Sequence, residues 1–501
     1  MDAAYKQLTH RLGQIEDLNR ALAVLNWDQQ TVMPPRGGKA RAEEMATLAG
    51  IIHERFIDPA IGQLLEQLRP IEQDYPAESI EASVVRVTRR DFEKRRRVPA
   101  ELATELSRAS ALAFPVWIEA RTHSNFALFA PHLEHTLSLK QRYIDCFDDF
   151  ACRYDVLLDD FEPRMTTTEV ASVFARLRDA LTPLVARIRD RQDRVQDNEF
   201  QGSFPPTRQR AMLLELLPSF GYEPEAMRLD PAPHPFASGI AIDDVRLTTR
   251  YNETHLKPAL FGTIHECGHG LYEAGISPAL DRLPIGHAAS LALHESQSRL
   301  WENIVGRSRP FWQFATPLLK KHFPDHFADT SVDSLYRGAN KMRPSLIRVE
   351  ADETTYALHI ILRFELEQDL INGDLAIADL PEAWNAKMRD YLGIGVPDDS
   401  RGVLQDIHWA DGYFGYFPTY ALGSVISAQI WRRATTDVPD IEDAFARGEF
   451  LGLREWLREH LHKYGRKFTA KETIELVAGG PLDPEPFIAY ITGKVDELYG
   501  A

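Results

Sequence analysis

The sequence predicts a mainly α-helical protein that forms one large unit with a small β-sheet. Through most of its 501 residues, apolar side chains recur at three- and four-residue spacing, which is the pattern of an amphipathic helix. One short segment, residues 239–250, is instead rich in β-branched residues. No internal repeat and no low-complexity linker interrupts the chain, so we expect a single domain over residues 1–501.

The first helix is predicted at the N-terminus, and breaks in the pattern divide the following helices. Its apolar face comprises Leu8, Leu12, Ile15, Leu18, Leu22 and Leu25. Pro34-Pro35 and Gly37-Gly38 then mark a turn. Further helices are expected over residues 98–123, 127–155 and 167–196, before a second break at Gly202–Pro206.

Residues 239–250, GIAIDDVRLTTR, read as one or two short strands joined by a turn at Asp243-Asp244. A strand edge at this place is suited to hydrogen-bond an extended peptide, and a purely structural hairpin is the alternative. Beyond residue 255 the helical pattern returns, with helices expected over 255–274, 286–305, 349–370, 374–394, 417–437 and 483–499.

Composition and charge indicate an ordinary globular protein. Hydrophobic residues make up 44% of the chain and charged residues 26%, with a formal net charge of −17. This acidic balance argues against nucleic acid as a partner. No apolar run is long enough to cross a membrane, the N-terminus lacks a secretory signal, and three cysteines do not make a disulfide framework. We therefore expect a cytoplasmic protein.

The segment HECGH, residues 265–269, matches the HExxH motif. On a helix, His265 and His269 lie on one face about one turn apart, close enough to share one ion. Glu266 follows the first ligand directly, where it can act as general base on the attacking water. The alternative is a helix with two unrelated histidines. HExxH thus predicts a zinc-type metallopeptidase.

A catalytic zinc needs a third protein ligand. Glu295 lies on a second predicted helix after the motif, and two packed helices would bring it to the histidines. Its alternative role is an i,i+4 pair with Arg299 on a solvated face. The other candidates for the third ligand are His287, the second choice, and then Glu273, His294 and Glu302. Cys267 falls inside the motif, but it points away from the metal face and is expected to pack.

Further motifs accompany HExxH along the chain. They are Trp27–Thr31 followed by Met33-Pro34, then His234-Pro235-Phe236, DxRxT at Asp244–Thr248, His294–Gln297, IRxxAD at Ile347–Asp352, and GxxQDxHW at Gly402–Trp409. In this order they resemble the carboxypeptidase Taq family of metallocarboxypeptidases, over nearly the whole chain and without a departure at a motif position.

The resemblance implies a metal-dependent carboxypeptidase that acts on peptides with free C-termini and broad side-chain preference. It implies His265, His269 and Glu295 as ligands of zinc or cobalt, and Glu266 as general base. The implied fold is a helical domain with a deep groove, similar to neurolysin and angiotensin-converting enzyme. Its walls would come from residues of about 1–200 and 201–501, and a homodimer is implied.

The same resemblance gives roles to further residues. Arg246 and Arg348 are expected to bind the C-terminal carboxylate, with a structural ion pair to Asp244 or Asp352 as the alternative. Asp352 has a third possible role, as the acceptor that orients a metal-binding histidine. His408 and Tyr420 are expected to stabilise the oxyanion, with core packing as the alternative.

Two other functions remain open on the sequence. One is a zinc oligopeptidase that cuts internal bonds of short peptides, which product analysis would distinguish. The other is a catalytically silent helical binding protein, against which the intact Glu266 argues.

Overall fold

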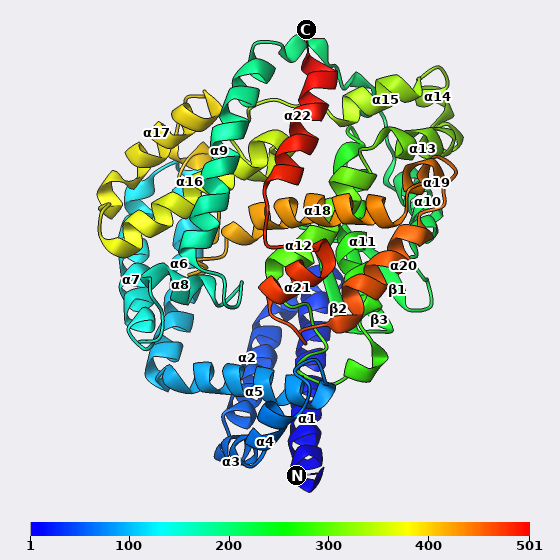
Figure 1. Ribbon diagram of the computed structural model, residues 1–501. Helices are drawn as coiled ribbons and strands as arrows, with labels where there is room; N and C mark the ends of the chain where they lie inside the picture. The colour runs from blue at the N-terminus through cyan, green and yellow to red at the C-terminus, as the bar shows by residue number, and fades with distance from the viewer. Residues whose placement is uncertain (1, 501) are drawn as a thin grey trace. The chain divides into compact units, whose positions relative to one another are not determined.

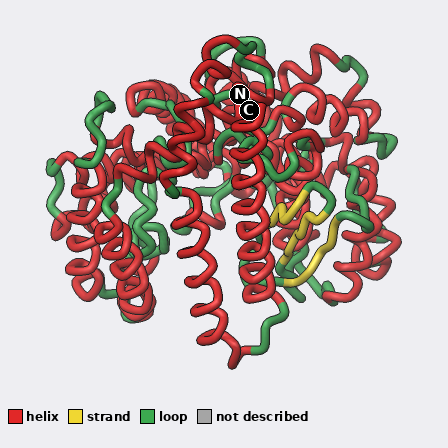
Figure 2. Tube along the Cα trace, turned by 90° about the horizontal axis from the view of Figure 1, so that it is seen from below, coloured by secondary structure: helices red, strands yellow, loops and turns green. Residues whose placement is uncertain are grey.

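Helices make up most of the structure, a computed structural model that describes residues 2–500 (Figure 1). Within these residues the strands form a single three-stranded sheet, drawn in yellow in Figure 2. The mainly α-helical class with one small sheet is therefore confirmed. None of the described helices is both long and apolar enough to span a bilayer.

The chain divides into two compact units, each drawn from separate stretches of sequence. Unit 1 contains the chain up to Arg96, Asp197–Ala339 and Ile430–Pro481, and unit 2 contains Arg97–Gln196, Asn340–Gln429 and the chain from Leu482. The single catalytic domain with a substrate groove, expected from the sequence, stays a prediction.

Unit 1 holds the sheet and most of the helices. Its helices are α1 (Asp2–Thr31), α2 (Gly38–Phe56), α3 (Pro59–Gln67), α4 (Arg69–Asp74), α5 (Ile80–Arg97), α10 (Pro206–Leu216), α11 (Lys257–Gly275), α12 (Leu291–Arg299), α13 (Arg309–His322), α14 (Pro324–Phe327), α15 (Val332–Ala339), α19 (Ile441–Ala446), α20 (Leu451–His460) and α21 (Ala470–Ala478). The predicted apolar face of α1 is buried at Leu8, Leu12 and Ile15.

Unit 2 is helical throughout its described residues. Its helices are α6 (Ala100–Thr122), α7 (Phe126–Ile144), α8 (Arg153–Leu158), α9 (Thr167–Arg189), α16 (Glu353–Asn372), α17 (Leu380–Leu392) and α22 (Glu485–Tyr499), and α18 (Pro418–Asp437) begins in this unit. Helix α16 is buried along most of its length, including the charged residues Arg363 and Glu367.

The sheet has the order β1-β3-β2, with β1 (Met227–Pro231) parallel and β2 (Ala237–Ala241) antiparallel to the central β3 (Asp244–Thr249). Val245 and Leu247 of β3 face α11, where a Cβ at Gly270 would lie 2.6 Å from Leu247 Cδ2. Since side chains alternate along a strand, Arg246 lies on the opposite face. The sheet thus supports the helix that carries HExxH.

Several predicted boundaries differ from the structure. The strand segment is confirmed, but β3 begins at Asp244, so the turn lies just before it, and β1 was not predicted. The helix expected over residues 127–155 is interrupted after Ile144 and resumes at Arg153. The helix expected from residue 286 begins only at Leu291, because the Ser290 hydroxyl caps it by accepting from Leu293 N.

Candidate active site

His265 and His269 lie on one face of α11, as the four-residue spacing predicts, with ring centroids 4.9 Å apart. The helix begins at Lys257, next to Pro258, whose fixed φ suits the first helical turn. On the same helix Glu266 and Cys267 are buried. Cys267 is not among the side chains that could hold a metal, in agreement with its predicted packing role.

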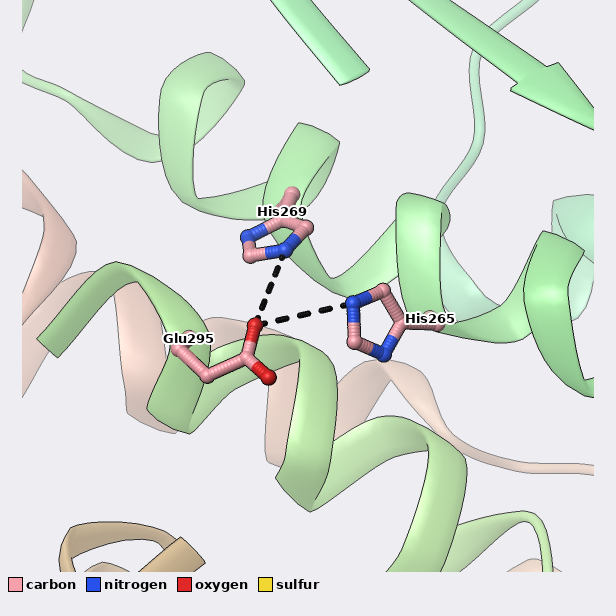
Figure 3. Close-up of side chains that lie close together, drawn as sticks. All are labelled: His265, His269 and Glu295. Atoms are coloured by element: carbon pink, nitrogen blue, oxygen red, sulfur yellow. Dashed lines mark ion pairs between the residues drawn. The ribbon is translucent and has the colours of Figure 1, made fainter. Parts of the chain in front are cut away.

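Glu295 of α12 brings a carboxylate to both histidines (Figure 3). Its Oε2 lies 3.4 Å from His269 Nε2 and 3.6 Å from His265 Nε2. The ligand atoms of these three residues all lie within 4.8 Å of one another, and within residues 2–500 no other such group occurs. Two imidazole nitrogens and one carboxylate oxygen are the donor set of many catalytic zinc sites, so the residues fit a divalent metal ion.

Gly268 allows α12 to approach closely enough for Glu295 to reach the histidines. A Cβ at this position would lie 2.6 Å from the backbone oxygen of Gln297 and 2.7 Å from Ser298 Cα. Any side chain at position 268 would therefore push the two helix backbones apart. The glycine of HECGH, Gly268, is required by this helix contact.

Glu302 orients His265 through Nδ1, the ring nitrogen that does not face Glu295. Its Oε2 lies 2.9 Å from His265 Nδ1, and because the carboxylate only accepts, Nδ1 carries a proton, so that in the neutral imidazole Nε2 keeps its lone pair. Glu302 lies in a π-helical turn, Leu300–Val305, that continues α12; such turns are frequent at functional sites. The sequence analysis named Glu302 only as a rival third ligand and proposed Asp352 for this orienting role.

The remaining rivals for the third ligand have other partners. His294 Nε2 lies 2.9 Å from Glu273 Oε1, and its ring stacks on that of His269 at 4.3 Å. His287 Nε2 lies 3.3 Å from Glu16 Oε1 of α1. His287 also precedes α12, in the loop position that its neighbouring glycine suggested.

The charged side chains around the two histidines of the HExxH motif favour the binding of a cation. Arg299 contacts both Glu295 and Glu302, at 2.6 and 3.5 Å. Burial raises the pKa of Glu295, but Arg299 and the two histidines outweigh it and hold that pKa well below its ordinary value. Burial, with a further contribution from the charges of Glu295 and Glu302, raises the pKa of Glu266 to about 7, and His265 opposes the rise.

The two imidazoles differ in their electrostatic surroundings. Burial lowers the pKa of His265, but Glu295 and Glu302 outweigh it and raise this pKa to about 9. His269 lacks the second carboxylate, so burial and the neighbouring His294 lower its pKa to about 3. The acidic surroundings of His265 are those that would stabilise a bound cation.

Arg246 is paired with Asp244 through two hydrogen bonds, Nε to Oδ1 at 2.8 Å and Nη2 to Oδ2 at 2.9 Å. Its guanidinium lies over the ring of Trp27, 4.5 Å from the centroid, and Arg228 lies over the same ring at 4.8 Å. This is the ion pair that the sequence analysis gave as the alternative to carboxylate binding, with an aromatic contact to α1 added.

Arg348, His408 and Tyr420 come together in unit 2. The Arg348 guanidinium lies over the Tyr420 ring, 4.9 Å from its centroid, and Tyr420 Oη lies 3.2 Å from His408 Nε2. Both Arg348 and His408 are buried. Three residues far apart in sequence, which only the resemblance had linked, therefore form one cluster.

Asp406 holds two buried arginines in this cluster. Arg348 donates from Nε and Nη2 to Asp406 Oδ1, both at 2.9 Å, and Arg363 Nη2 lies 2.5 Å from Oδ2. The alternative to carboxylate binding paired Arg348 with Asp352, and that partner is wrong, because Arg348 pairs with Asp406. Asp352 instead caps α16 by accepting from the backbone N–H groups of Thr354 and Thr355.

Sequence reasoning missed Arg363, Tyr356 and Asp406 as members of this cluster. Arg363 is fully buried on α16, and Tyr356 Oη accepts from Arg348 Nη1 at 2.9 Å. Asp406 was quoted inside the GxxQDxHW motif without a role. An arginine in the middle of an apolar helix face was the available signal for Arg363, because a buried guanidinium requires a carboxylate partner.

An HExxH helix joined by a glutamate from a neighbouring helix defines the class of metallopeptidases. Comparison with known families gives the same class. The model of the carboxypeptidase Taq (M32) metallopeptidase family matches residues 7–495. The chain belongs to this family and is a metal-dependent carboxypeptidase, so peptides are its substrates.

Relatives resemble the chain over its whole length. Thermostable carboxypeptidase 1 of Thermus thermophilus is 41% identical, covering 100% of this chain and 99% of the relative. The M32 carboxypeptidase structure from Deinococcus radiodurans R1 has a TM-score of 0.96 at 38% identity, covering 100% of both chains. A Pyrococcus furiosus carboxypeptidase structure has a TM-score of 0.95 at 35% identity, covering 98% and 99%.

Proposed function

We propose that this carboxypeptidase binds its metal through His265, His269 and Glu295 and uses Glu266 as the general base. The observation that carries the proposal is the convergence of one oxygen and two nitrogens from α11 and α12 within 4.8 Å. When bound, the metal ion would supply Lewis-acid activation of water and of the scissile carbonyl. Glu266, buried next to His265 in sequence, takes the proton of the attacking water and returns it to the leaving amine.

Arg348 is proposed to bind the C-terminal carboxylate of the substrate. Asp406 takes its Nε and one proton of Nη2, and Tyr356 takes one proton of Nη1. A guanidinium has five N–H groups, so the edge between Nη1 and Nη2 keeps two donors for a carboxylate. Charge supports this role, since the described contacts of Arg348 and Arg363 give these two cations one shared carboxylate.

His408 and Tyr420 are proposed to stabilise the developing oxyanion. Burial lowers the pKa of His408 to about 3, with Asp406 opposing and Arg348 adding to the effect. The imidazole is therefore neutral at pH 7, and the pair offers hydrogen bonds rather than a charge. Preorganised donors of this kind are worth about 10²–10³ in kcat.

Arg246 is kept as a second substrate-binding candidate. Asp244 occupies Nε and Nη2, which leaves the Nη1 donors for a ligand. Arg348 has stronger support, because its remaining donors share a cluster with His408 and Tyr420.

Zinc is proposed as the metal, with cobalt as the alternative, because two histidines and a glutamate are the ligand set of zinc peptidases. A homodimer and a cytoplasmic location are also proposed, from the family resemblance and from the low cysteine content. Sedimentation velocity tests the dimer, with a mass of one chain as the contradicting result. The oligopeptidase and silent-protein alternatives are not favoured by the family assignment.

The experiment that tests Arg348 compares two forms of one peptide, a free acid and its C-terminal amide, on Arg348→Ala. We expect KM for the free acid to rise by about 10- to 100-fold, since a charged hydrogen bond is worth about 1.5–3 kcal/mol. The amide should be affected far less. Arg153→Ala, which removes an exposed arginine of unit 2, is the control. Equal losses on both peptides would remove Arg348 as the carboxylate anchor.

A further inference from the structure

Glu367 is a fully buried carboxylate on α16 that the reaction as described does not use. Within residues 2–500 no ion pair of Glu367 is found; three hydrogen-bond donors surround it instead. Trp409 Nε1 donates to its Oε1 at 2.8 Å, and Tyr154 Oη and Gly415 N donate to Oε2 at 2.6 and 2.9 Å. The positive charge of Arg363 favours the ionised form of Glu367, but burying a carboxylate outside an ion pair is costly, so its position calls for an explanation.

Two of the three donors belong to the segment that carries His408. This segment, Asp406 to Gly415, is called the His408 loop. Trp409 follows His408 directly, and Gly415 ends the loop with a φ of +86°. A Cβ at Gly415 would lie 2.6 Å from the Leu157 backbone. The third donor, Tyr154, lies on α8, so Glu367 links the loop to both α8 and α16.

Helix α16 thus holds the His408 loop at two places. Arg363 binds Asp406 at the start of the loop, and Glu367, four residues later on the same helix, binds Trp409 and Gly415. Within the loop, Tyr413 N donates to the His408 backbone oxygen at 2.8 Å. The two attachments leave the His408 backbone little freedom to shift.

The chemistry of the contact explains why a carboxylate is used. All three partners are donors, and an ionised carboxylate is the side chain that accepts at both oxygens without donating. A glutamine would present its NH₂ group either to Trp409 or to Tyr154 and Gly415. Burial raises the pKa of Glu367 to about 7, with Tyr154 and Gly415 opposing the rise, so assays belong at pH 8, where the carboxylate is ionised.

We infer that Glu367 is a positioning residue for the reaction: it fixes the His408 loop so that His408 and Tyr420 stabilise the transition state. The inference rests on the role proposed for His408. It also assigns different roles to two residues of α16, Arg363 and Glu367. The Arg363–Asp406 attachment orients Arg348 and sets KM. Glu367 sets kcat, because its partner Trp409 directly follows His408 and Arg348 is not among its hydrogen-bond donors.

The test measures kcat and KM at pH 8 for a free-acid peptide on Glu367→Gln. Because glutamine cannot accept all three hydrogen bonds of Glu367, we expect kcat to fall by about 10-fold or more. KM should stay within about twofold of the wild-type value. Glu365→Gln is the matched control. Glu365 lies two residues away on α16 and pairs with Arg178 and Lys387, so its loss removes ion pairs without touching the loop, and wild-type kcat is expected.

A spectroscopic signature separates positioning from general destabilisation. With ¹⁵N-labelled tryptophan, Glu367→Gln should shift the Trp409 indole resonance, assigned through Trp409→Phe, and leave the other indole resonances in place. A loss of kcat with all indole resonances displaced would overturn the inference. If Glu367→Gln does not fold, Tyr154→Phe and Trp409→Phe each remove one donor. Both should lower kcat by about threefold or more, and wild-type kcat in both would overturn it.

His408→Ala distinguishes a failure of this inference from a failure of the proposed function. A wild-type kcat in His408→Ala contradicts the proposed role of His408. It also contradicts the inference about Glu367, which depends on that role. A low kcat in His408→Ala together with a wild-type kcat in Glu367→Gln overturns the inference alone. Low kcat in both, with unchanged KM in Glu367→Gln, supports it.

Discussion

At the scale of single residues, chemistry distinguishes side chains that the sequence pattern leaves equivalent. Glu295 and Glu302 follow each other by seven residues, and either was a possible third ligand. In the structure Glu295 faces Nε2 of both histidines, whereas Glu302 reaches the opposite nitrogen of His265. We therefore propose Glu295 as a metal ligand and Glu302 as the residue that sets the protonation of His265.

Glu302→Gln is expected to weaken metal affinity by about 10- to 100-fold, the range for partners that orient metal ligands. The amide oxygen still accepts from His265 Nδ1, but the negative charge that makes the imidazole a stronger ligand is lost. Competition with a chelator measures the affinity. Glu16→Gln is the control, because Glu16 pairs with His287 outside the metal group. Equal affinity in Glu302→Gln and wild type would contradict the orienting role.

Glu266→Gln is expected to keep the metal and lose about 10³-fold in kcat, within the range for general acid–base catalysis. Glutamine fills the same volume beside His265 but takes up no proton. Metal content per chain checks that the metal is kept, and peptide hydrolysis checks the loss of kcat. A variant that remains active would show that another group is the base.

At the scale of elements, the site depends on how closely two helices pack. Helix α11 supplies two ligands and α12 the third, and Gly268 lies where their backbones meet. The sheet supports α11 from another side through Gly270 and Leu247. A π-helical turn after α12 places Glu302. Helical periodicity in the sequence predicts where helices lie, but it does not predict the distance between two helices or a π-helical turn.

Gly268→Ala is expected to lower metal affinity and kcat by about 10-fold or more, since the added methyl meets the Gln297 backbone at 2.6 Å and overpacking costs about 1–3 kcal/mol. Gly262→Ala is a matched control on the same helix. Its Cβ would lie 4.0 Å from Pro235 Cγ, an ordinary van der Waals distance, and alanine favours a helix. Similar losses in both variants would show that the close helix contact at Gly268 is not what limits the site.

At the scale of the whole molecule, metal binding is expected to stabilise the fold. The three ligands lie on two helices and converge only in the folded chain. An ion that binds only the native state stabilises it by about 2.7 kcal/mol at a free concentration of 100 times Kd. Chelation should therefore lower the thermal midpoint by several degrees.

His269→Ala should melt at the chelated midpoint with or without added metal. His135→Ala, which changes an exposed histidine of unit 2, should keep the full response. Differential scanning calorimetry measures both variants. A metal-dependent midpoint in His269→Ala would show that the stabilising ion binds elsewhere.

The sequence by itself determined the helical class, the placing of His265 and His269 on one helix face, and the family, because these depend on spacing along one helix and on motifs read in order. About half of the helices were placed, with ends shifted where caps such as Ser290 decide, and helices such as α2–α5, α13 and α19–α21 were not predicted. The short strand β1 was missed, since it exists through pairing with β3.

Tertiary structure alone decided which partner each charged residue meets. In the alternative to carboxylate binding, Arg348 was expected to pair with Asp352, its neighbour in sequence, but it contacts Asp406, 58 residues away. Arg363 and Glu367 had no predicted role, and folding places one against Asp406 and the other against Trp409. The physical reason is that ion pairs and buried hydrogen bonds form between side chains close in space. Sequence periodicity shows which face of a helix is buried, but not what packs against it.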